Sequence, residues 1–557
     1  MQVHQICSSE YAKIRITMEN AKEKIYSILE NLLQNLNIED VKIIVERPHD
    51  LVNGDYSSNI ALLASKKLNI SPMELAQELV DGFGKSEIFE KIEIATPGFI
   101  NFYLSKKYLQ SQTEKIVLEG KEYGKSKKGK GKRASVEFVS ANPTGPLHIG
   151  NARGGPLGDT LANVLEKAGY EVTREYLHNN VGGQVERLGE TIYFEIHPDQ
   201  KPEDYVAHYP GEYVKDLANL VKEQLEGSEQ YEELSQEQFI EKAGEIAVEI
   251  MLQDILRDCK DMGIVYDKVV KESDLRRQVP QVLEKIHKYL KENEGALWFA
   301  PNDEFLKDRE TVVKKSDGEY TYFASDIAYH NDKMSQNDLA IDVLGSNHSG
   351  HVPRLQAAVK ALGYDPDNFK TILYQFVRLK RGDEVVRMGK RFGNIITSKE
   401  VLDEVGKDAF RFFLLMPKNS THMDFDLELA KKQATENPVF YVQYAHSRIS
   451  SIFSKAQNYN FSNAKYELLT TNEEVDLIRK LIVFPELIEE ISDSFAVNSL
   501  TTYAMEIATA FHKFYEAEKV ITDVKEESEA RLALIKATQA VLKNTLDLLG
   551  VSAPERM

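Results

Sequence analysis

The sequence predicts an α/β fold in which a doubly wound parallel sheet forms the core of the chain. ASVEFV, at 134–139, is an apolar run typical of a buried strand, and YEVTREYL, at 170–177, is a second. Between them, apolar residues recur at helical spacing from Leu157 to Ala168, and Gly169 stands where a helix commonly ends. A strand, a helix and a strand in this order form a unit whose two strands are parallel.

Further elements extend this pattern towards the C-terminus. AIDVLG, at 340–345, and TILYQFV, at 371–377, are expected to be strands of the same sheet. An acidic segment at about 200–310 is expected to be a helical insertion between the first unit and these strands. From about residue 427 the apolar spacing is purely helical, which predicts an all-α helical bundle at the C-terminus.

The first part of the chain predicts a separate N-terminal α+β domain. A helix is expected at 21–35, strands at 41–48 and 91–105, and a further helix at 71–83. The segment 123–133 holds six Lys or Arg residues and is expected to be a solvated linker, although it could also contact phosphate. The chain is therefore divided into an N-terminal extension whose order the sequence leaves open (1–20), the α+β domain (21–122), the basic linker (123–133), the sheet domain (134–420) and the helical domain (421–557).

The composition limits the classes of protein to which the chain can belong. The 557 residues suffice for about three to four domains, and 42% hydrophobic residues exclude global disorder. A net charge of −19 excludes a uniformly basic nucleic-acid coat but allows a local basic path. Cys7 and Cys259 are the only cysteines, which excludes a disulfide framework and a Cys-based zinc site. Because the chain has no long apolar run and no apolar leader, a soluble, cytoplasmic protein is expected.

A motif at the end of the first strand predicts a phosphate-binding site. NPTGPLHIGN, at 142–151, lies between the strand at 134–139 and its helix. Ligands bind at the carboxyl edge of an open parallel sheet, and the N–H groups of a helix start attract phosphate. His148 and Asn151 are expected to face one phosphate, although a surface histidine beside a glycine-rich turn is an equally good interpretation of His148. A nucleotide is expected to approach the nearby glycines, which are Gly150, Gly154 and Gly155.

A second motif, RMGKRFGN at 387–394, follows the last predicted strand. Arg387, Lys390 and Arg391 could clamp a polyphosphate and neutralise the charge that develops on a leaving pyrophosphate. Taken alone, an ordinary basic loop is the commoner explanation of such a segment.

Two other interpretations fail on spacing. A Walker A motif needs a glycine where Leu79 and Glu119 stand before the two Gly-Lys-Ser sequences. His348 and His351 could suggest metal ligands, but no carboxylate or cysteine follows them at a familiar spacing. No structural metal is therefore expected.

The two motifs occur in the order in which one enzyme class carries them. LHIGN, at 147–151, resembles the HIGH motif of class I aminoacyl-tRNA synthetases, and RMGKR, at 387–391, resembles their KMSKS motif. From about residue 21 to Met557, the chain resembles the bacterial arginyl-tRNA synthetases. The segments that carry this resemblance are EFVSANPTGPLHIGNARGG, DMGIVYD, YTYFASDIAYH, DVLGSNHSGHVPR, VQYAHSRI and LLGVSAPERM.

The chain departs from the class motifs at three positions. Asn151 replaces the second histidine of HIGH, and its amide can donate a hydrogen bond to phosphate but carries no charge. Gly389 replaces the serine of KMSKS and Arg387 its first lysine, whereas Lys390 keeps the catalytic lysine. These departures obscure the individual contributions of Asn151 and Arg387.

The resemblance implies an ATP-dependent arginine–tRNA ligase with a Rossmann-like catalytic core. In this family the carboxylate of arginine attacks the α-phosphate of ATP, which gives arginyl-adenylate and pyrophosphate with Mg²⁺. The 2′-hydroxyl of the terminal adenosine of tRNA then takes the arginyl group, and AMP leaves. Positioning and charge stabilisation are expected to dominate such catalysis. Family members commonly need bound tRNA before they activate arginine.

The resemblance also implies the residues that handle ATP. The expected catalytic residues are His148, Asn151, Lys390 and Arg387. The expected ATP-binding residues are His148, Gly150, Asn151, Gly345, Met388 and Lys390.

The guanidinium of arginine requires planar acceptors, preferably carboxylates. By resemblance, Asp326 and Tyr322, four residues apart, are expected to bind the guanidinium. Glu137 and Asn142 are expected to anchor the α-amino and carboxylate end, with His348 as a further substrate contact. Without the resemblance, Glu137 would be interpreted as a salt-bridged strand acid and Tyr322 as a core aromatic residue.

Both flanking domains are expected to contact tRNA. The N-terminal domain resembles the family's D-loop-contacting domain, where Asn101 is the candidate residue. The C-terminal domain resembles the family's anticodon-binding bundle, whose candidates are Tyr444, His446, Arg448 and Met557. Each of these side chains could instead serve packing or a surface ion pair. A monomer without structural zinc and without a membrane partner is expected.

Two competing functions can be weighed on the sequence. Another class I synthetase is disfavoured, because zinc ligands and room for a large editing insertion are missing. A catalytically inactive tRNA-binding paralogue is disfavoured by the presence of His148, Lys390, Asp326 and Tyr322.

Overall fold

The computed structural model describes residues 20–227, 234–307, 309–382, 384–385, 396–462 and 464–557. The chain divides into two compact units. Unit 1 comprises Met1–Glu119, Ala456–Ile482 and Lys513–Ala537, and unit 2 comprises Gly120–Lys455, Val483–His512 and Thr538–Met557.

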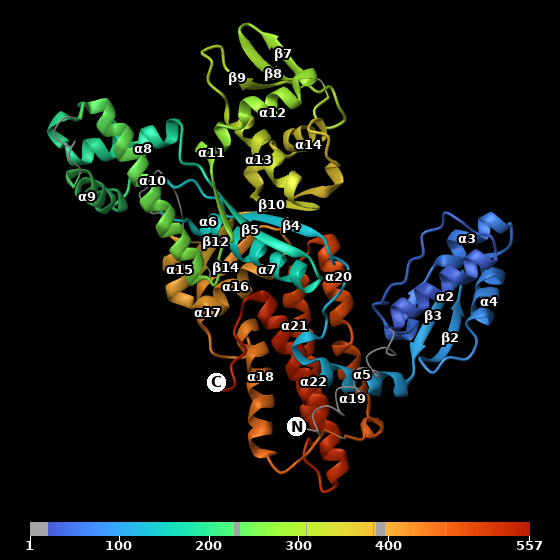
Figure 1. Cartoon of the computed structure of the whole chain (residues 1–557). Coiled ribbons are helices and arrows are strands. Elements are labelled where there is room, and N and C mark those ends of the chain that lie inside the picture. Colours follow the sequence, from blue (N-terminus) through green and yellow to red (C-terminus); the bar gives the residue numbers. More distant parts are fainter. Residues whose placement is uncertain (1–19, 228–233, 308, 383, 386–395, 463) are drawn as a thin grey trace, which may run out of the picture. The chain divides into compact units, whose positions relative to one another are not determined.

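Unit 1 contains an antiparallel sheet that packs with helices (Figure 1). The sheet has the order β1-β3-β2, with strands Tyr56–Ser58 (β1), Phe89–Ala95 (β2) and Phe99–Leu104 (β3). The helices are α2 (Ala21–Asn35), α3 (Ile60–Leu68) and α4 (Pro72–Phe83). The predicted helix at 21–35 is confirmed, because its apolar face buries Ile25, Leu29 and Leu33. The N-terminal domain is therefore α+β, as the sequence predicts.

The strand expected at 41–48 is wrong. These residues, all of them described, form no strand and make one isolated bridge, between Glu46 and Ser57. The free edge of β3 is taken instead by β1, which the sequence analysis did not anticipate. Pro48 also lacks the N–H group that a longer ladder would need.

Helices from later in the chain belong to the same unit. They are α5 (Lys106–Glu119), η9 (Tyr466–Leu468), α19 (Asn472–Leu481) and the first part of α22 (Lys525–Leu549). Arg531 of α22 is buried and donates hydrogen bonds to Glu474 and Glu518, each 2.7 Å long. These bonds satisfy the buried charges, which would otherwise be costly.

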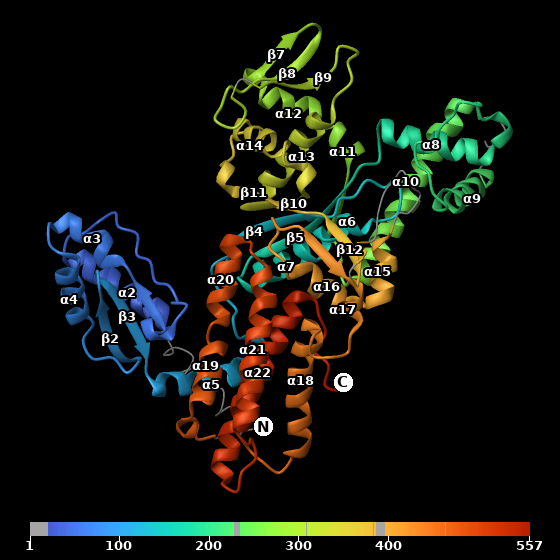
Figure 2. The same cartoon turned by 180° about the vertical axis from the view of Figure 1, so that it is seen from behind.

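The core of unit 2, within the described residues, is a five-stranded sheet of the order β11-β10-β4-β5-β6, and every neighbouring pair is parallel. Its strands are β4 (Arg133–Phe138), β5 (Glu171–His178), β6 (Lys268–Lys271), β10 (Leu339–Gly345) and β11 (Phe369–Tyr374). Helix α7 (Gly154–Lys167) covers one face, and α13 (Tyr322–Gln336) and α14 (Val352–Ala361) cover the other (Figures 1 and 2). The predicted doubly wound parallel sheet is confirmed.

Helix α7 ends where the sequence predicts. Gly169 has φ of +98°, and the N–H of Tyr170 donates to the carbonyl of Leu165 over 3.0 Å, as in a Schellman cap. A Cβ atom on Gly169 would lie 2.8 Å from the carbonyl oxygen of Ser126. This position therefore requires glycine for two separate reasons, the backbone conformation and the close approach.

The basic segment 123–133 packs on the sheet domain. The N–H of Ser126 donates to the carbonyl of Lys167 over 3.0 Å, and that of Gly129 donates to the carbonyl of Ala168 over 2.9 Å. The exposed lysines of this segment are thus carried on a backbone that is hydrogen-bonded to the end of α7.

Two insertions separate β5 from β10. The first holds α8 (Gly183–Ile196), α9 (Tyr213–Glu226) and α10 (Gln236–Asp261), which share an apolar core of their own. The second holds α11 (Glu272–Arg276), α12 (Val279–Lys285) and the antiparallel strands β7 (Leu290–Asn293), β8 (Ala296–Phe299) and β9 (Thr311–Lys314).

The expectation of a purely helical insertion at about 200–310 is therefore wrong after Asp261. The range also contains β6 of the main sheet and the hairpin of β7 and β8. Glu294 and Gly295 close that hairpin with φ of +50° and +74°, a left-handed pair that suits a tight β-turn.

A smaller sheet and helices complete unit 2. The sheet has the order β13-β12-β14, with strands Val377–Arg381 (β12), Glu384–Val385 (β13) and Met423–Asp426 (β14). The helices are α6 (Ile149–Ala152), α15 (Ser398–Val405), α16 (Lys407–Leu415), α17 (Leu427–Lys431), α18 (Pro438–Lys455), α20 (Phe484–Ser494), and the parts of α21 (Asn498–Ala517) and α22 that lie in this unit. The predicted change to helices at about residue 427 is confirmed.

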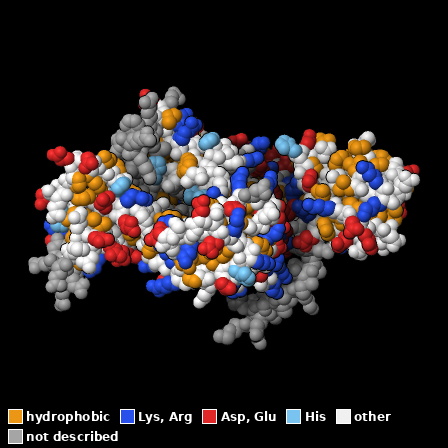
Figure 3. Space-filling model, turned by 90° about the horizontal axis from the view of Figure 1, so that it is seen from above, with side chains coloured by type: hydrophobic (Ala, Val, Ile, Leu, Met, Phe, Trp, Pro, Cys, Tyr) orange, Lys and Arg blue, Asp and Glu red, His pale blue; other side chains and the backbone are white. Residues whose placement is uncertain are grey.

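Surface charge is mixed. On the face shown in Figure 3, Lys and Arg side chains lie among Asp and Glu side chains, so that neither sign covers the view. Within the described part of the chain, no helix combines the length and the apolar character that a membrane span would need.

The Gly169 cap can be tested with a matched pair of substitutions. Gly131 also has a positive φ, of +77°, but no atom lies within 4 Å of its Cβ position. Gly131→Ala should therefore cost about 1 kcal/mol for the backbone conformation alone. Gly169→Ala should cost more, because its methyl group also meets the Ser126 carbonyl. Urea unfolding of both variants measures the difference, and equal midpoints would contradict the packing argument.

Candidate active site

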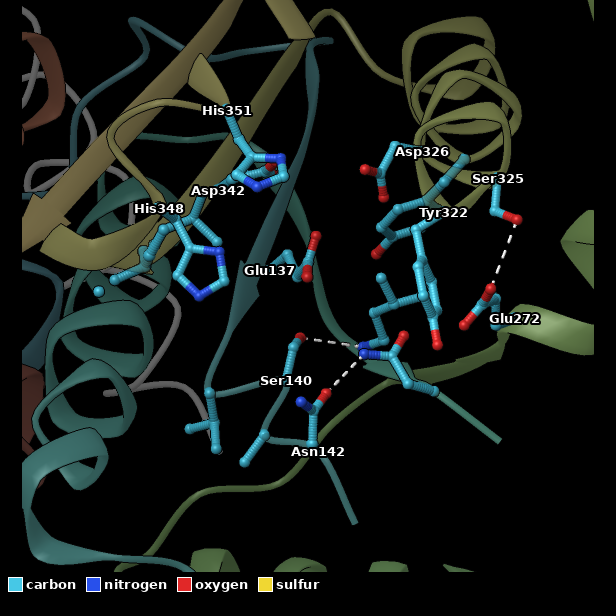
Figure 4. A pocket seen from close by; sticks show the side chains of 18 of the residues that line it. Glu137, Ser140, Asn142, Glu272, Tyr322, Ser325, Asp326, Asp342, His348 and His351 are labelled. Atoms are coloured by element: carbon cyan, nitrogen blue, oxygen red, sulfur yellow. Dashed lines mark hydrogen bonds between the residues drawn. The ribbon is translucent and has the colours of Figure 1, made fainter. Parts of the chain in front are cut away.

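A pocket of about 640 Å³ lies at the carboxyl edge of the parallel sheet. Its walls come from the ends of β4 and β10, from α13 and from the loops around them (Figure 4). β4 and β10 are neighbours, but the chain proceeds from β4 outward to β5 and β6 before it returns to β10. The winding direction therefore reverses between these two strands, which is where open α/β sheets bind their ligands.

The pocket gathers residues that the sequence placed far apart. Of the predicted site residues that the structure describes, seven line it. They are Glu137, Asn142, Asn151, Tyr322, Asp326, Gly345 and His348.

Carboxylates dominate the charge of the pocket wall. Among the described residues, the acids that line it are Glu137, Glu272, Asp326 and Asp342. Burial raises the pKa of Asp326 to about 7; His330 opposes this shift, and the carboxylates of Glu137, Glu272 and Asp342 add to it. A cation that enters the pocket would relieve this repulsion and ionise Asp326.

Tyr322 and Asp326 lie on the first turns of α13 and both face the pocket (Figure 4). Tyr322 is 50% exposed, so that it is not the core aromatic residue of the alternative interpretation. Its hydroxyl lies 2.7 Å from the position that a Cβ on Gly182 would take. Gly182, with φ of +93°, thus leaves space beside a pocket residue.

Sequence reasoning missed Glu272, which directly follows β6 and lines the pocket. Arg276 donates to its Oε1 from Nε and Nη2, each over 3.2 Å, and Ser325 lies 3.5 Å from the same oxygen (Figure 4). Oε2 is buried without a hydrogen-bond partner in the described part of the chain. Burial raises the pKa of Glu272, and Arg276 opposes the shift. A polar ligand could supply the missing partner. The sequence feature that could have indicated Glu272 is its position, because an acid at the carboxyl end of a strand lies where open α/β sheets bind ligands.

The loop after β4 turns sharply beside the pocket. Val139 and Ser140 have φ of +68° and +36°, values that residues with side chains rarely adopt. The Ser140 hydroxyl accepts a hydrogen bond from the N–H of Leu177 over 3.0 Å, and Asn179 donates to the side-chain oxygen of Asn142 over 2.8 Å (Figure 4). The second bond fixes the amide orientation of Asn142, so that its NH₂ group is the donor that it can offer a ligand.

His148 caps the short helix α6. Its Nδ1 accepts a hydrogen bond from the N–H of Gly150 over 2.9 Å, so the neutral ring carries its proton on Nε2. A Cβ on Gly150 would lie 2.9 Å from this Nδ1. Asn151, one turn further on, lines the pocket, and its carbonyl accepts a hydrogen bond from Tyr374 over 3.1 Å.

Two glycines of this segment serve packing. Cβ atoms on Gly154 and Gly155 would lie 2.9 Å from the ring of Tyr374 and from the side chain of Ile264, respectively. Both glycines are buried. The expectation that they make room for a nucleotide is therefore wrong, because protein side chains fill that space.

Arg387, Met388 and Lys390 of the second motif lie outside the described residues. The chain just after that motif, however, lies against the first motif. The N–H of Ile149 donates to the carbonyl of Ile396 over 3.2 Å, and the N–H of Ser398 donates to the carbonyl of Leu147 over 2.7 Å. The fold thus brings residues 396–398, which follow the second motif, next to the first motif.

His348 and His351 line the pocket from the end of β10. Burial lowers the pKa of both rings. The pKa of His348 is lowered further by its interaction with His351, and that of His351 by Arg354. At neutral pH both are therefore uncharged hydrogen-bonding groups.

Among the described residues, no cluster of His, Cys, Asp and Glu has an arrangement that could hold a metal ion.

The predicted tRNA contacts have different environments. Asn101, on β3, is buried and accepts a hydrogen bond from the Ser57 hydroxyl over 2.7 Å. Tyr444 is partly buried, and Arg448 donates to its hydroxyl over 3.2 Å. His446 is buried, and its Nδ1 lies 2.9 Å from the carbonyl oxygen of Pro554. Met557 is 55% exposed. His446 therefore holds the C-terminal tail, and RNA contacts for all five remain predictions.

Family models match nearly the whole chain. A model described as the arginyl tRNA synthetase N terminal domain matches residues 19–104, and one described as the catalytic domain of class I (R) tRNA synthetases matches 112–461. A DALR anticodon binding domain model matches 442–557.

Individual proteins agree with these matches. An arginine–tRNA ligase of Staphylococcus carnosus is 41% identical over 530 residues, which are 93% of this chain and 95% of the relative. A solved structure of a putative arginyl-tRNA synthetase from Campylobacter jejuni is 33% identical, with a TM-score of 0.73, and covers 82% of this chain and 100% of that one. The Thermus thermophilus arginyl-tRNA synthetase, at 23% identity, has the same fold with a TM-score of 0.77 over 96% of this chain and 100% of that one.

The raised pKa of Asp326 predicts a pH-dependent stability. The folded protein holds this proton up to about pH 7, whereas the unfolded chain releases it near 3.8. The contribution of Asp326 to stability should therefore fall as pH rises from about 4 to about 7. Asp326→Asn should remove this fall, so that the variant gains in urea midpoint over wild type between pH 5 and pH 8. The exposed Asp523→Asn serves as control. A constant difference between variant and wild type would contradict the shift.

Proposed function

The chain belongs to the arginyl-tRNA synthetase family, and we propose that it attaches L-arginine to its cognate tRNA through an arginyl-adenylate. ATP is the second substrate, and AMP and pyrophosphate are the products. The observation that carries the proposal is the acidic pocket, in which Glu272 and Asp326 lie among further carboxylates. A guanidinium is planar, permanently charged and rich in donors, so that it matches such a wall better than any other amino-acid side chain.

The guanidinium end of arginine is assigned to Asp326, Tyr322 and Glu272. Oε2 of Glu272 lacks a partner in the described part of the chain, and a donor from the ligand would satisfy it. The neighbouring carboxylates repel the charged form of Asp326, and a bound cation would relieve this repulsion. A neutral isostere of arginine would leave Asp326 without a cationic partner, which is how a polar pocket discriminates in one step.

The other end of arginine is assigned to Glu137, Asn142 and His348. A carboxylate can accept from an ammonium group, whereas an amide NH₂ can donate to a carboxylate. Glu137 is therefore assigned the α-ammonium and Asn142 the α-carboxylate. His348, uncharged at neutral pH, can hydrogen-bond to either substrate from the end of β10.

The phosphates of ATP are assigned to the two motifs. Nε2–H of His148 and the amide of Asn151 can donate to phosphate oxygens, and Asn151 and Gly345 line the pocket. Gly150 is buried and its N–H is donated to His148, so Gly150 is assigned to ATP by its place in the motif alone. Arg387, Met388 and Lys390, by motif, would complete the site, with Lys390 as the cation that stabilises the leaving pyrophosphate. Mg²⁺ would enter with ATP as part of the substrate.

The flanking regions are assigned to tRNA. We assign 21–122 to the D-loop, through Asn101, and 421–557 to the anticodon, through Tyr444, His446, Arg448 and Met557. Residues 134–420 form the proposed catalytic domain, and 123–133 join it to the N-terminal domain. The protein is proposed to act as a monomer in the cytoplasm. With a net charge of −19, tRNA binding should rely on local cations and weaken as salt rises.

Amino-acid-dependent exchange of pyrophosphate into ATP tests the proposal. With tRNA present, arginine should support exchange, and no other standard amino acid should. Exchange with a different amino acid would refute the substrate. Binding of tRNA without exchange for any amino acid would identify a catalytically inactive tRNA-binding protein instead.

The guanidinium contact predicts the effect of Asp326→Asn. The loss of a charged acceptor should raise the KM for arginine on the order of 10- to 100-fold, with a much smaller change in the KM for ATP. Asp332→Asn is the matched control, since Asp332 lies on the same helix but pairs with Lys268 over 2.9 Å and does not line the pocket. A near-wild-type KM for arginine in Asp326→Asn would remove that residue from the site.

A further inference from the structure

Three carboxylates lie side by side across the parallel sheet. Asp342 on β10 is in register with Glu137 on β4, and Glu137 is in register with Glu175 on β5. Each of the three is at most 4% exposed. Neighbouring like charges on one face of a sheet repel one another, and burial makes the repulsion stronger. This row of acids therefore needs cations above it.

Helix α13 supplies a cation at the centre of the row. The side chain of Lys333 is fully buried, and its Nζ donates to Asp342 Oδ1 over 2.6 Å and to Glu137 Oε2. Tyr329, one turn earlier, donates to Glu175 over 2.9 Å. Burial alone would lower the pKa of Lys333, but the Asp342 and Glu137 carboxylates hold it above its usual value.

His330 supplies a second positive charge, which pairs with Asp342. Its Nδ1 lies 2.7 Å from the backbone oxygen of Asp326, and its Nε2 lies 3.0 Å from Oδ2 of Asp342. A carbonyl and a carboxylate both accept hydrogen bonds, so both ring nitrogens carry protons. Burial lowers the pKa of His330, but the Asp342 carboxylate more than offsets it. Asp342 is thus paired with two cations, whereas the ion pair of Glu137 is made with Lys333.

Glu137 therefore depends on Lys333 for its charge. Burial raises the pKa of Glu137; Lys333 opposes this most strongly, Asp342 adds to it, and a hydrogen bond with Ser140 opposes it to a smaller extent. Lys333 donates to Oε2 of Glu137, and Glu137 is also one of the residues that line the pocket, so the same carboxylate is held from the core and available to a ligand (Figure 4). Without the ammonium group, the pKa of Glu137 would rise further, which favours the protonated form that does not attract a cation.

We propose that Lys333 is a positioning residue that keeps Glu137 ionised and fixed, and thereby sets how strongly the pocket holds the α-ammonium of its amino acid. Lys333 does not itself line the pocket and acts through Glu137. The inference rests on the proposed function, since it takes arginine as the ligand and Glu137 as its ammonium acceptor.

Two ligands that differ only in the α-ammonium group distinguish this positioning role from a merely structural one. 5-Guanidinopentanoate has the guanidinium and carboxylate of arginine but lacks the α-ammonium. In Lys333→Met, measured by calorimetry on the full-length chain, arginine affinity should fall on the order of 10- to 100-fold. The affinity for 5-guanidinopentanoate should change less than about threefold, because the loss of one cation and the protonation of Glu137 leave the net charge of the pocket unchanged.

A second variant keeps the test valid if Lys333→Met folds poorly. Glu137→Gln removes the charge that Lys333 balances, so that Lys333→Met combined with Glu137→Gln leaves no unpaired acid at this position. The double variant should bind arginine as tightly as Glu137→Gln alone, since two residues that act through one contact are not additive. Lys268→Met is the control, because Lys268 pairs with Glu175 and Asp332 and should leave the affinity for both ligands unchanged.

The outcomes are distinct. Selective loss of arginine in Lys333→Met, or equal affinities of the double variant and Glu137→Gln, supports the role. If wild type binds arginine but Lys333→Met loses both ligands equally, or the double variant binds arginine more weakly than Glu137→Gln, the inference is overturned and the proposed function stands. If wild type does not bind arginine at all, the proposed function is overturned, and the inference with it.

Discussion

The row formed by Asp342, Glu137 and Glu175 is the constraint on which the site depends. Three buried acids in register across a parallel sheet would repel one another, so α13 must lie over them with Lys333 and His330. The same helix then presents Tyr322 and Asp326 one to two turns earlier, at the open edge. Charge balance in the core and recognition at the rim are therefore carried by one element, and a shift of α13 would disturb both.

Strand order explains why segments that are far apart in the chain meet at this edge. The chain returns to β10 beside β4 after the outer strands, which places the loop after β4 and the residues after β10 around one pocket. The backbone bonds between 147–149 and 396–398 then join the chain just after the second motif to the first motif. Adenylate formation requires two substrates in contact, so the juxtaposition of these segments suits the proposed reaction.

The sequence predicted what depends on local spacing. The helix that ends at Gly169, between two strands, follows from a periodicity within a few turns. The four-residue spacing of Tyr322 and Asp326 places both on one helix face, but their proposed role comes from the family resemblance. Glu272 and Asp342 were not predicted as pocket acids, because their contribution depends on which strands lie side by side. For Glu137 the two interpretations, a substrate contact and a salt-bridged strand acid, are not exclusive. Glu137 is ion-paired on its strand and also lines the pocket. Gly154 and Gly155 were misinterpreted because the side chains that fill their space come from distant segments.

The central claim is that a guanidinium neutralises crowded carboxylates, and the most direct test is to count protons. At pH 7 the Asp326 carboxyl of the empty pocket, with a pKa of about 7, is half protonated. Calorimetry of arginine binding in buffers of different ionisation enthalpy should then show the release of about half a proton per arginine. Binding without proton exchange, or with proton uptake, would contradict the account.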